Sequence, residues 1–142
     1  MLMKWITHSH IHVDRGACPW LIQRFVDAQA EFLFTAKDIV LEVAEKEDAI
    51  PYDIMGVDLG HKDGHCSFVS IVRKYRITDP GVLKIAEIVN ACDSPDITSN
   101  VYAPGLEAII SGFSMLFPDD HMNLEQQFIL YDALYAIFKS QT

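Results

Sequence analysis

The densest concentration of chemically versatile side chains lies in the run HVDRGACPWLIQRFVD, which begins at His12. Pro19 suits the first position of a helix, where its missing N–H costs nothing, so the run predicts a helix that begins there with Cys18 as its N-cap. Unpaired N–H groups and the positive dipole end of such a helix favour the thiolate form of a cysteine. With Arg15 nearby, they would also hold a small oxyanion. We therefore expect an oxyanion site at Arg15 and Cys18; the alternative is that Cys18 is buried and simply caps the helix.

Histidine and aspartate side chains lie just before this run and at its start. His8, His10, His12 and Asp14 recur every second residue, which places them on one face if the segment is extended. Such ligands suit Zn, Mn or Fe. Four ligands on one strand span too far for a single ion, so at most two of them could serve. The alternative, favoured for His8 and His10, is a histidine-rich edge that binds no metal.

A second group of possible ligands lies in the run GHKDGHC, which contains His61, His65 and Cys66. The glycines allow the backbone to turn these side chains inward. We predict a metal site at His12, His61 and Cys66, with His65 as the alternative to Cys66, provided that the fold brings the two runs together. The alternative is that Cys66 is a small buried residue before a helix. The sequence contains no nucleotide or flavin motif.

The remaining polar residues of the first run are expected to support this centre. Trp20 and Arg24 are four residues apart and could stack as a cation–π pair. Asp14 could neutralise Arg15 and weaken the field at the helix end. A carboxylate is unfavourable at the end of a helix, so Asp27 predicts a basic partner, either Arg24 or Arg15.

Aspartates elsewhere are expected to shape turns and helix ends. Asp93 and Asp96 flank Pro95 and could bind a cation, but loop aspartates more often define turns. The pair at 119–120 is typical of a helix N-terminus, and a ligand role for His121 is the minority interpretation.

The hydrophobic pattern predicts the elements that must position these residues. Strands are expected at 4–7, 31–34 and 51–54, and helices at 36–46, 67–75 and 80–92, from 104, and from 119. For the helix at 36–46, Thr35 is the expected cap and Asp38 completes a capping box. The prediction is a helix-rich α+β fold with about six helices and a small sheet of two or three strands.

Composition narrows the class of protein. The 142 residues are expected to form a single domain over 1–142. A formal net charge of −9 disfavours direct binding to nucleic acid or anionic membranes. No apolar run is long enough to span a membrane. Three widely spaced cysteines indicate free thiols in a reducing cytoplasm rather than a disulfide framework.

The chain resembles the chromate-resistance ChrB C-terminal domain family. The resemblance is carried by HVDRGACPWLIQRFVD, by EFLF shortly after it, by LGHKDGHCSF at 59–68 and by YDALYA at 131–136, in that order. The family-like positions are His12, Asp14, Arg15, Cys18, Pro19, Trp20, Arg24, Phe25, His61, Cys66 and Phe68. His8, His10 and His65 lie outside the family pattern.

The resemblance implies a role in chromate resistance, in which ChrB is viewed as a chromate-responsive regulator of efflux genes. The domain usually follows a regulatory segment or a rhodanese-like domain, so we do not carry DNA recognition over to this chain. No catalytic mechanism comes with the resemblance. We expect a sensing or accessory module that binds a metal ion or small oxyanion, with a thiol- or metal-dependent oxidoreductase as the alternative. A partner protein or a second copy of the chain is a further expectation.

Overall fold

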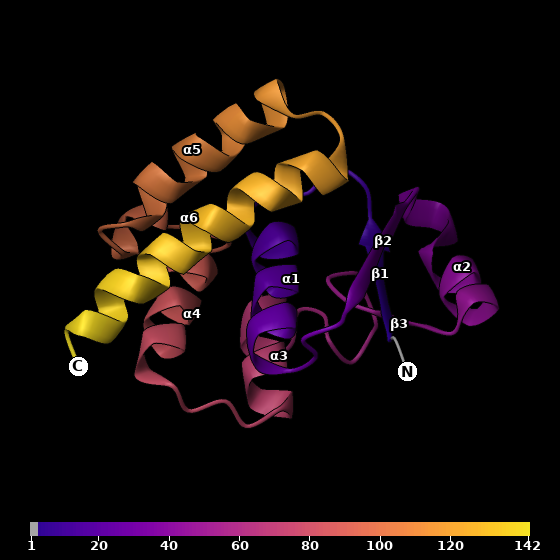
Figure 1. The fold of residues 1–142 in the computed structure, drawn as a ribbon, viewed down its shortest axis with the longest axis horizontal. Helices are drawn as coiled ribbons and strands as arrows, with labels where there is room; N and C mark the ends of the chain where they lie inside the picture. Colours follow the sequence, from indigo (N-terminus) through magenta and orange to yellow (C-terminus); the bar gives the residue numbers. More distant parts are fainter. Residues whose placement is uncertain (1–2) are drawn as a thin grey trace.

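The computed structural model describes residues 3–142, which contain six α-helices and a three-stranded sheet (Figure 1). The strands are β1 (Lys4–His8), β2 (Glu31–Thr35) and β3 (Ala49–Pro51). The helices are α1 (Val13–Phe25), α2 (Val40–Glu47), α3 (Ser67–Lys74), α4 (Pro80–Cys92), α5 (Ala103–Leu116) and α6 (Asp120–Ser140), with short 3-10 turns η1 (Lys37–Ile39) and η2 (Ile97–Ser99). The predicted helix-rich α+β class is confirmed.

The sheet is parallel, with β1 between β2 and β3. Side chains alternate across β1: Trp5 belongs to the large core shared with the helices, and Ile6 belongs to a small core under α2. Figure 1 shows this division, with α2 on one side of the sheet and α1 on the other. The carboxyl ends of β1 and β3 therefore lie at the same edge, next to the N-terminus of α1.

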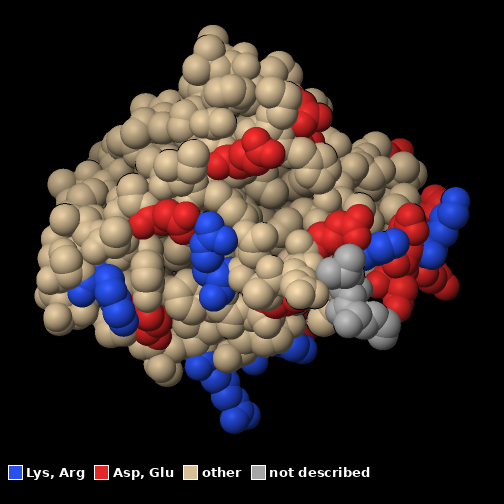
Figure 2. All heavy atoms as spheres, in the orientation of Figure 1, with Lys and Arg blue, Asp and Glu red and all other residues tan. Residues whose placement is uncertain are grey.

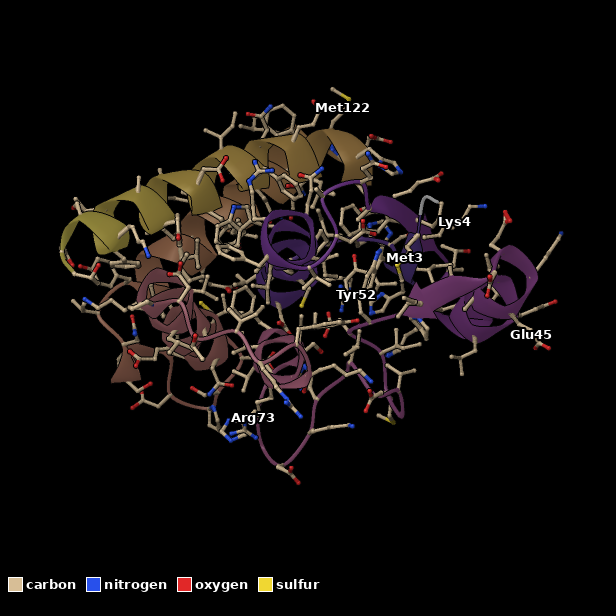
Figure 3. The ribbon with its side chains drawn as sticks, turned by 60° about the horizontal axis from the view of Figure 1, so that its bottom comes forward. Met3, Lys4, Glu45, Tyr52, Arg73 and Met122 are labelled. Atoms are coloured by element: carbon tan, nitrogen blue, oxygen red, sulfur yellow. The ribbon has the colours of Figure 1, made fainter. Side chains whose placement is uncertain are left out.

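Helix α1 lies at the centre of the main core, against α3, α4 and α6. Large buried aromatic side chains fill this core, among them Trp20, Phe68 and Tyr131; each contributes about 1.5–3 kcal/mol through burial. Gly16 allows α1 to approach α6 closely, because a Cβ at this position would lie 1.9 Å from Gln127 Oε1. Figure 3 shows Tyr52 in the interior, between the sheet and the helices; this side chain is fully buried.

Charged side chains are distributed unevenly over the surface. Figure 2 shows acidic and basic side chains gathered at the end of the molecule that carries α2, and few charges along its upper edge, where α5 lies. Exposed apolar residues of α5 include Ile109, Met115 and Leu116. None of the helices described between residues 3 and 142 is long and apolar enough to cross a bilayer.

The predicted start of α1 is wrong, because the helix begins at Val13 and contains Pro19 in its interior. His12 is the N-cap, so Cys18 lies within the helix rather than at its end. An interior proline costs roughly 3 kcal/mol, but nearly every side chain of α1 from Val13 to Ile22 is buried, and packing offsets that cost.

The predicted histidine face is also wrong. His8 ends β1, His10 has a positive φ of 66°, and His12 caps α1, so the segment is not extended and has no common face.

Other boundaries follow the sequence closely or shift by a few residues. Helix α4 has the predicted bounds, and Asp119 caps α6 as expected. The expected helix at 36–46 begins instead as η1, because Thr35 remains in β2 and pairs with His8. Asp48 adopts a left-handed conformation that ends α2 abruptly, and so β3 begins two residues earlier than predicted.

Candidate metal centre

A cavity of about 280 Å³ opens at the edge of the sheet where β1 and β3 end. Ligand sites in open sheets with parallel strands commonly lie outside the carboxyl ends of the strands. The cavity is lined by the N-terminus of α1, the loop after β3, the end of α4 and one residue of α5. Its titratable residues are His12, Asp14, Arg15, Asp53, His61, Cys92, Asp93 and Glu107.

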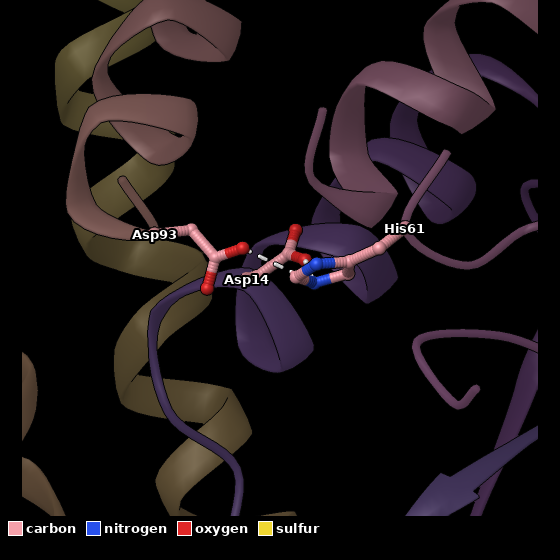
Figure 4. Close-up of side chains that lie close together, drawn as sticks. All are labelled: Asp14, His61 and Asp93. Atoms are coloured by element: carbon pink, nitrogen blue, oxygen red, sulfur yellow. Dashed lines mark ion pairs between the residues drawn. The ribbon is translucent and has the colours of Figure 1, made fainter. Parts of the chain in front are cut away.

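Asp14, His61 and Asp93 converge within this cavity (Figure 4). His61 Nε2 lies 3.4 Å from Asp14 Oδ2 and 3.2 Å from Asp93 Oδ2. One ligand atom from each of the three residues lies within 4.8 Å of the other two. Figure 4 shows that the three side chains approach from different segments: Asp93 follows α4, Asp14 lies on α1, and His61 belongs to the loop before α3. We call these residues the carboxylate–imidazole triad.

Asp14 is the buried and rigid member of the triad. Its two carboxylate oxygens accept hydrogen bonds from the backbone N–H groups of Ser67 (2.9 Å) and Phe68 (2.9 Å), at the N-terminus of α3. Burial opposes ionisation, but His61 and these two N–H donors hold the pKa of Asp14 below its ordinary value. Asp14 is therefore a fixed, ionised carboxylate whose hydrogen bonds also connect α1 to α3.

His61 is positioned by the closed loop between β3 and α3. Within this loop Asp53 N–H donates to Leu59 O (3.1 Å), and Ser70 Oγ donates to Gly60 O (2.6 Å). Gly60 is required there, since a Cβ would lie 2.5 Å from Ile54 O. The hydrogen bond to Asp14 and the nearby charge of Asp93 raise the pKa of His61 to about 9, against partial burial.

Asp53 extends the acidic cluster behind His61. Its Oδ1 lies 3.5 Å from His61 Nε2 and accepts a hydrogen bond from Ser67 Oγ (2.7 Å), and its Oδ2 lies 3.2 Å from Arg15 Nε. Burial and the neighbouring charge of Asp14 raise the pKa of Asp53 to about 7. The residue also has a positive φ of 48°, a conformation that aspartate adopts more easily than most residues.

Asp93 is the more accessible of the two carboxylates in the triad. It follows the last residue of α4, where the helix dipole disfavours a negative charge. Partial burial raises the pKa of Asp93, and the positive charge of His61 acts against that rise. The site thus places three carboxylates around one imidazole, an arrangement whose mutual repulsion a bound cation would relieve.

The structure separates the three predicted metal ligands. His61 belongs to the triad, whereas His12 lies in the same cavity but pairs with Glu107, with 2.6 Å between Nε2 and Oε1. Cys66 is buried as the N-cap of α3, its backbone N–H donates to Asn90 Oδ1 (2.9 Å), and burial raises the pKa of its thiol.

The predicted oxyanion site at Arg15 and Cys18 is not assembled either. Cys18 is fully buried, with Sγ 3.5 Å from Asp14 Oδ1. Burial and the charge of Asp14 raise the pKa of this thiol well above its ordinary value, so the expected thiolate is wrong. Arg15 does line the cavity, where it faces Asp53 rather than Cys18.

Trp20 and Arg24 have a structural role away from the cavity. Both donate to Asp132 of α6, Trp20 Nε1 at 2.8 Å and Arg24 Nη2 at 2.9 Å. Arg24 lies over Phe128, 5.3 Å from the ring centroid, instead of over Trp20.

The expected basic partner of Asp27 is also absent from the described contacts. Asp27 accepts a hydrogen bond from Trp5 Nε1 (3.2 Å), not from an arginine.

Sequence reasoning missed Asp53 and Glu107 and gave Asp93 a minor role. Asp93 carried a usable signal, because an acidic residue directly after a helix needs a compensating charge. Asp53 and Glu107 carried none, since only the tertiary fold brings them to the cavity.

These features define a helix-rich α+β domain with an acidic, imidazole-containing cavity at the carboxyl edge of its sheet. The family model described as ChrB, C-terminal domain matches residues 5–138, so the chain belongs to that family, as the sequence resemblance indicated. Protein ChrB from Cupriavidus metallidurans is 31% identical over an alignment of 140 residues, and the match covers 96% of this chain. The chain spans only 41% of the length of that relative. No solved structure matches the chain.

Proposed function

We propose that this domain binds a divalent transition metal ion at Asp14, His61 and Asp93, and that it acts as a metal-dependent sensing or accessory module in chromate resistance. The observation that carries the proposal is the convergence of the three ligand atoms within 4.8 Å. One imidazole nitrogen and two carboxylate oxygens form a donor set that suits Mn(II), Fe(II) or Zn(II).

The charge of the cavity favours a cation over a free oxyanion. Four carboxylates line it, from Asp14, Asp53, Asp93 and Glu107, against a single arginine. Part of that charge is balanced by protons, because Asp53 has a raised pKa and His61 binds a proton at neutral pH. A metal ion would replace these protons, as metal binding to protonated ligands commonly does.

The connection to chromate rests on the family. The matching relative is a ChrB protein, and the family is associated with chromate resistance. Because the chain covers less than half of that relative, the partners of the whole protein do not transfer to it. A cytoplasmic location and assembly with a partner protein or a second copy stay predictions.

Calorimetric titration of chelator-treated protein with MnCl2 tests the proposal, with elemental analysis of the purified protein beside it. We expect one metal ion per chain and a loss of at least about tenfold in affinity for Asp93→Asn, because one of three charged ligands becomes neutral. Asp96→Asn is the matched control: Asp96 is also an exposed loop aspartate, but its carboxylate accepts hydrogen bonds from Thr98. Equal affinities for the two variants, or no binding by the wild type to Mn(II), Fe(II) or Zn(II), would refute the proposal.

A metal-dependent oxidoreductase is the second candidate. It is favoured by the number of protein ligands, since three leave coordination positions open toward the cavity, as catalytic sites require. The thiol-dependent version is disfavoured, because Cys18 and Cys66 are buried and burial raises the pKa of both thiols. Cys92 lines the cavity, but burial raises the pKa of its thiol to about 11. Chromate reduction by excess ascorbate that the metal-loaded protein accelerates above the rate without protein, with the acceleration lost in Asp93→Asn, would favour the enzyme over the sensing module.

A further inference from the structure

A second cavity, of about 320 Å³, lies on the other side of Arg15, Asp53 and His61, which line both cavities. Its other walls come from the end of β1, from η1 and from the loop after β3, through His8, Lys37, Ile54, Met55 and Gly56. We call it the cationic cavity, because Arg15 and Lys37 both line it.

The positive character of this cavity is visible at His8. Burial and then the charges of Arg15 and Lys37 lower the pKa of His8, so both basic groups act on the same imidazole. At neutral pH His8 is therefore an uncharged hydrogen-bonding group in a cavity that two cations also line. Asp53 is the only carboxylate among the described lining residues of the cationic cavity, and Arg15 Nε pairs with it at 3.2 Å.

Arg15 is held in a fixed orientation. Its Nη1 donates to His10 O (2.9 Å), and the N–H of His10 in turn donates to Asp120 Oδ1 (3.0 Å) at the start of α6. Of the guanidinium nitrogens only Nη1 makes a hydrogen bond within residues 3–142: Nε lies 3.2 Å from Asp53 Oδ2 as an ion pair but is buried without a hydrogen-bond partner, and no hydrogen bond engages Nη2. A preorganised guanidinium with an available N–H edge is the group that binds oxyanions most effectively.

We propose that the cationic cavity binds a small oxyanion between Arg15, Lys37 and His8. The ligand class follows from the donors: two permanent cations and a neutral imidazole match an anion with several acceptor oxygens. The volume lies at the lower end of the range for small-molecule sites, so it suits a compact anion of the size of phosphate or sulfate. This inference goes beyond the metal centre and does not need it.

The proposed oxyanion site keeps Arg15 but not Cys18, the partner that the sequence predicted. The expected partner Cys18 is buried inside α1, whereas His8 and Lys37 come from the sheet edge and from η1. Because Arg15, Asp53 and His61 separate the two cavities, an anion bound here would lie next to the metal centre.

Titration of chelator-treated protein with sodium phosphate at low ionic strength tests the site. Binding is measured by calorimetry and by the NMR signal of the Gly56 amide. We expect saturable binding that Lys37→Gln weakens by about fivefold, the effect of losing one exposed charge. Lys46→Gln is the matched control, because Lys46 is an exposed lysine of α2 outside the cavity and its loss changes the net charge equally. The control is expected to bind phosphate within twofold of the wild type.

Further comparisons test whether binding depends on the shape of the anion rather than on general charge, and whether it is independent of the metal centre. Sulfate should compete with phosphate, and nitrate, a planar monoanion, should compete weakly. Equal weakening by the two lysine variants, or no saturable binding of phosphate and sulfate, would overturn the proposal. The phosphate titration uses metal-free protein. The absence of phosphate binding would therefore leave the MnCl2 titration unaffected, and the absence of Mn(II) binding would leave the phosphate titration unaffected.

Discussion

At the scale of single residues, the chemistry of the domain depends on His61. Its imidazole lies within 3.5 Å of Asp14, Asp53 and Asp93, and the hydrogen bond to Asp14 together with nearby negative charge raises its pKa to about 9. A raised pKa means that protonation of His61 stabilises the folded state. This contribution is complete below about pH 6.5, the ordinary pKa of histidine, and is lost as the pH rises through about 9.

The first prediction follows from that shift. In metal-free protein the His61 ring should titrate near pH 9 by NMR, and in Asp93→Asn it should titrate lower, because one of the charges that stabilise imidazolium is removed. Since a metal ion needs the neutral ring, affinity for Mn(II) should increase with pH between 6 and 9. A His61 ring that titrates near pH 6.5, the ordinary pKa of histidine, would contradict the prediction.

The sequence could predict part of this site and not the rest. The run from His12 identified Asp14 and Arg15, and the second run identified His61, because several reactive residue types lie close together there. It could not predict which histidine meets which carboxylate. His12 reaches Glu107 and His61 reaches Asp93 through contacts between segments that are far apart in the chain, and no local pattern encodes such pairings.

At the scale of elements, the predicted boundaries succeed where a local capping signal acts alone. The Asp-Pro pair before α4 fixes its start, and Asp119 fixes the start of α6, where its carboxylate accepts from Met122 N–H. The prediction fails at Pro19, because burial of the preceding turn outweighs the preference of proline for a helix start. The displaced start changed the assignment of Cys18 from a helix N-cap to a buried residue in the interior of α1.

Asp79 provides a test at this scale. Its Oδ1 accepts from Gly81 N–H (2.8 Å) at the start of α4, and its Oδ2 accepts from Tyr135 Oη (2.6 Å) and Lys139 Nζ (3.2 Å) of α6. Asp79→Ala should destabilise the fold by about 1–2 kcal/mol, the cost of a lost N-cap, measured as a lower urea midpoint. Asp38→Ala is the control, because Asp38 is an exposed residue of η1 that makes no side-chain cap.

The pH dependence of that effect has a definite sign. Burial acts against ionisation, but the hydrogen bonds from Tyr135, Lys139 and the helix N-terminus hold the pKa of Asp79 below its ordinary value. The stabilisation is therefore present above the pKa of an unfolded aspartate and is lost as the pH falls through the lower, folded value. The difference between wild type and Asp79→Ala should shrink in acid, and a difference independent of pH would argue that the variant acts through packing alone.

At the scale of the whole molecule, the two cavities share one wall and depend on the same tertiary arrangement. The edge of the sheet supplies His8 and Asp53, α1 supplies Asp14 and Arg15, and the loop before α3 supplies His61. These segments meet only in the folded chain, so a metal ion bound to the triad binds the native state in preference to the unfolded state. Metal binding should then be visible as global stability, without reference to any activity.

The last prediction is thermal. Free Mn(II) at about 100 times its dissociation constant stabilises the native state by about 2.7 kcal/mol, and in a protein of this size each kcal/mol raises Tm by roughly 3 °C. Tm should therefore increase by about 8 °C. Under the same conditions a tenfold weaker affinity leaves only about 1.4 kcal/mol of stabilisation, so Asp93→Asn should show about half of this increase or less. Lys37→Gln should show all of it, because Lys37 lines only the cationic cavity. An increase in Asp93→Asn as large as that of the wild type would place the metal elsewhere on this acidic chain. A net charge of −9 offers many weak carboxylate sites, whereas among residues 3–142 only the triad combines two carboxylates with an imidazole.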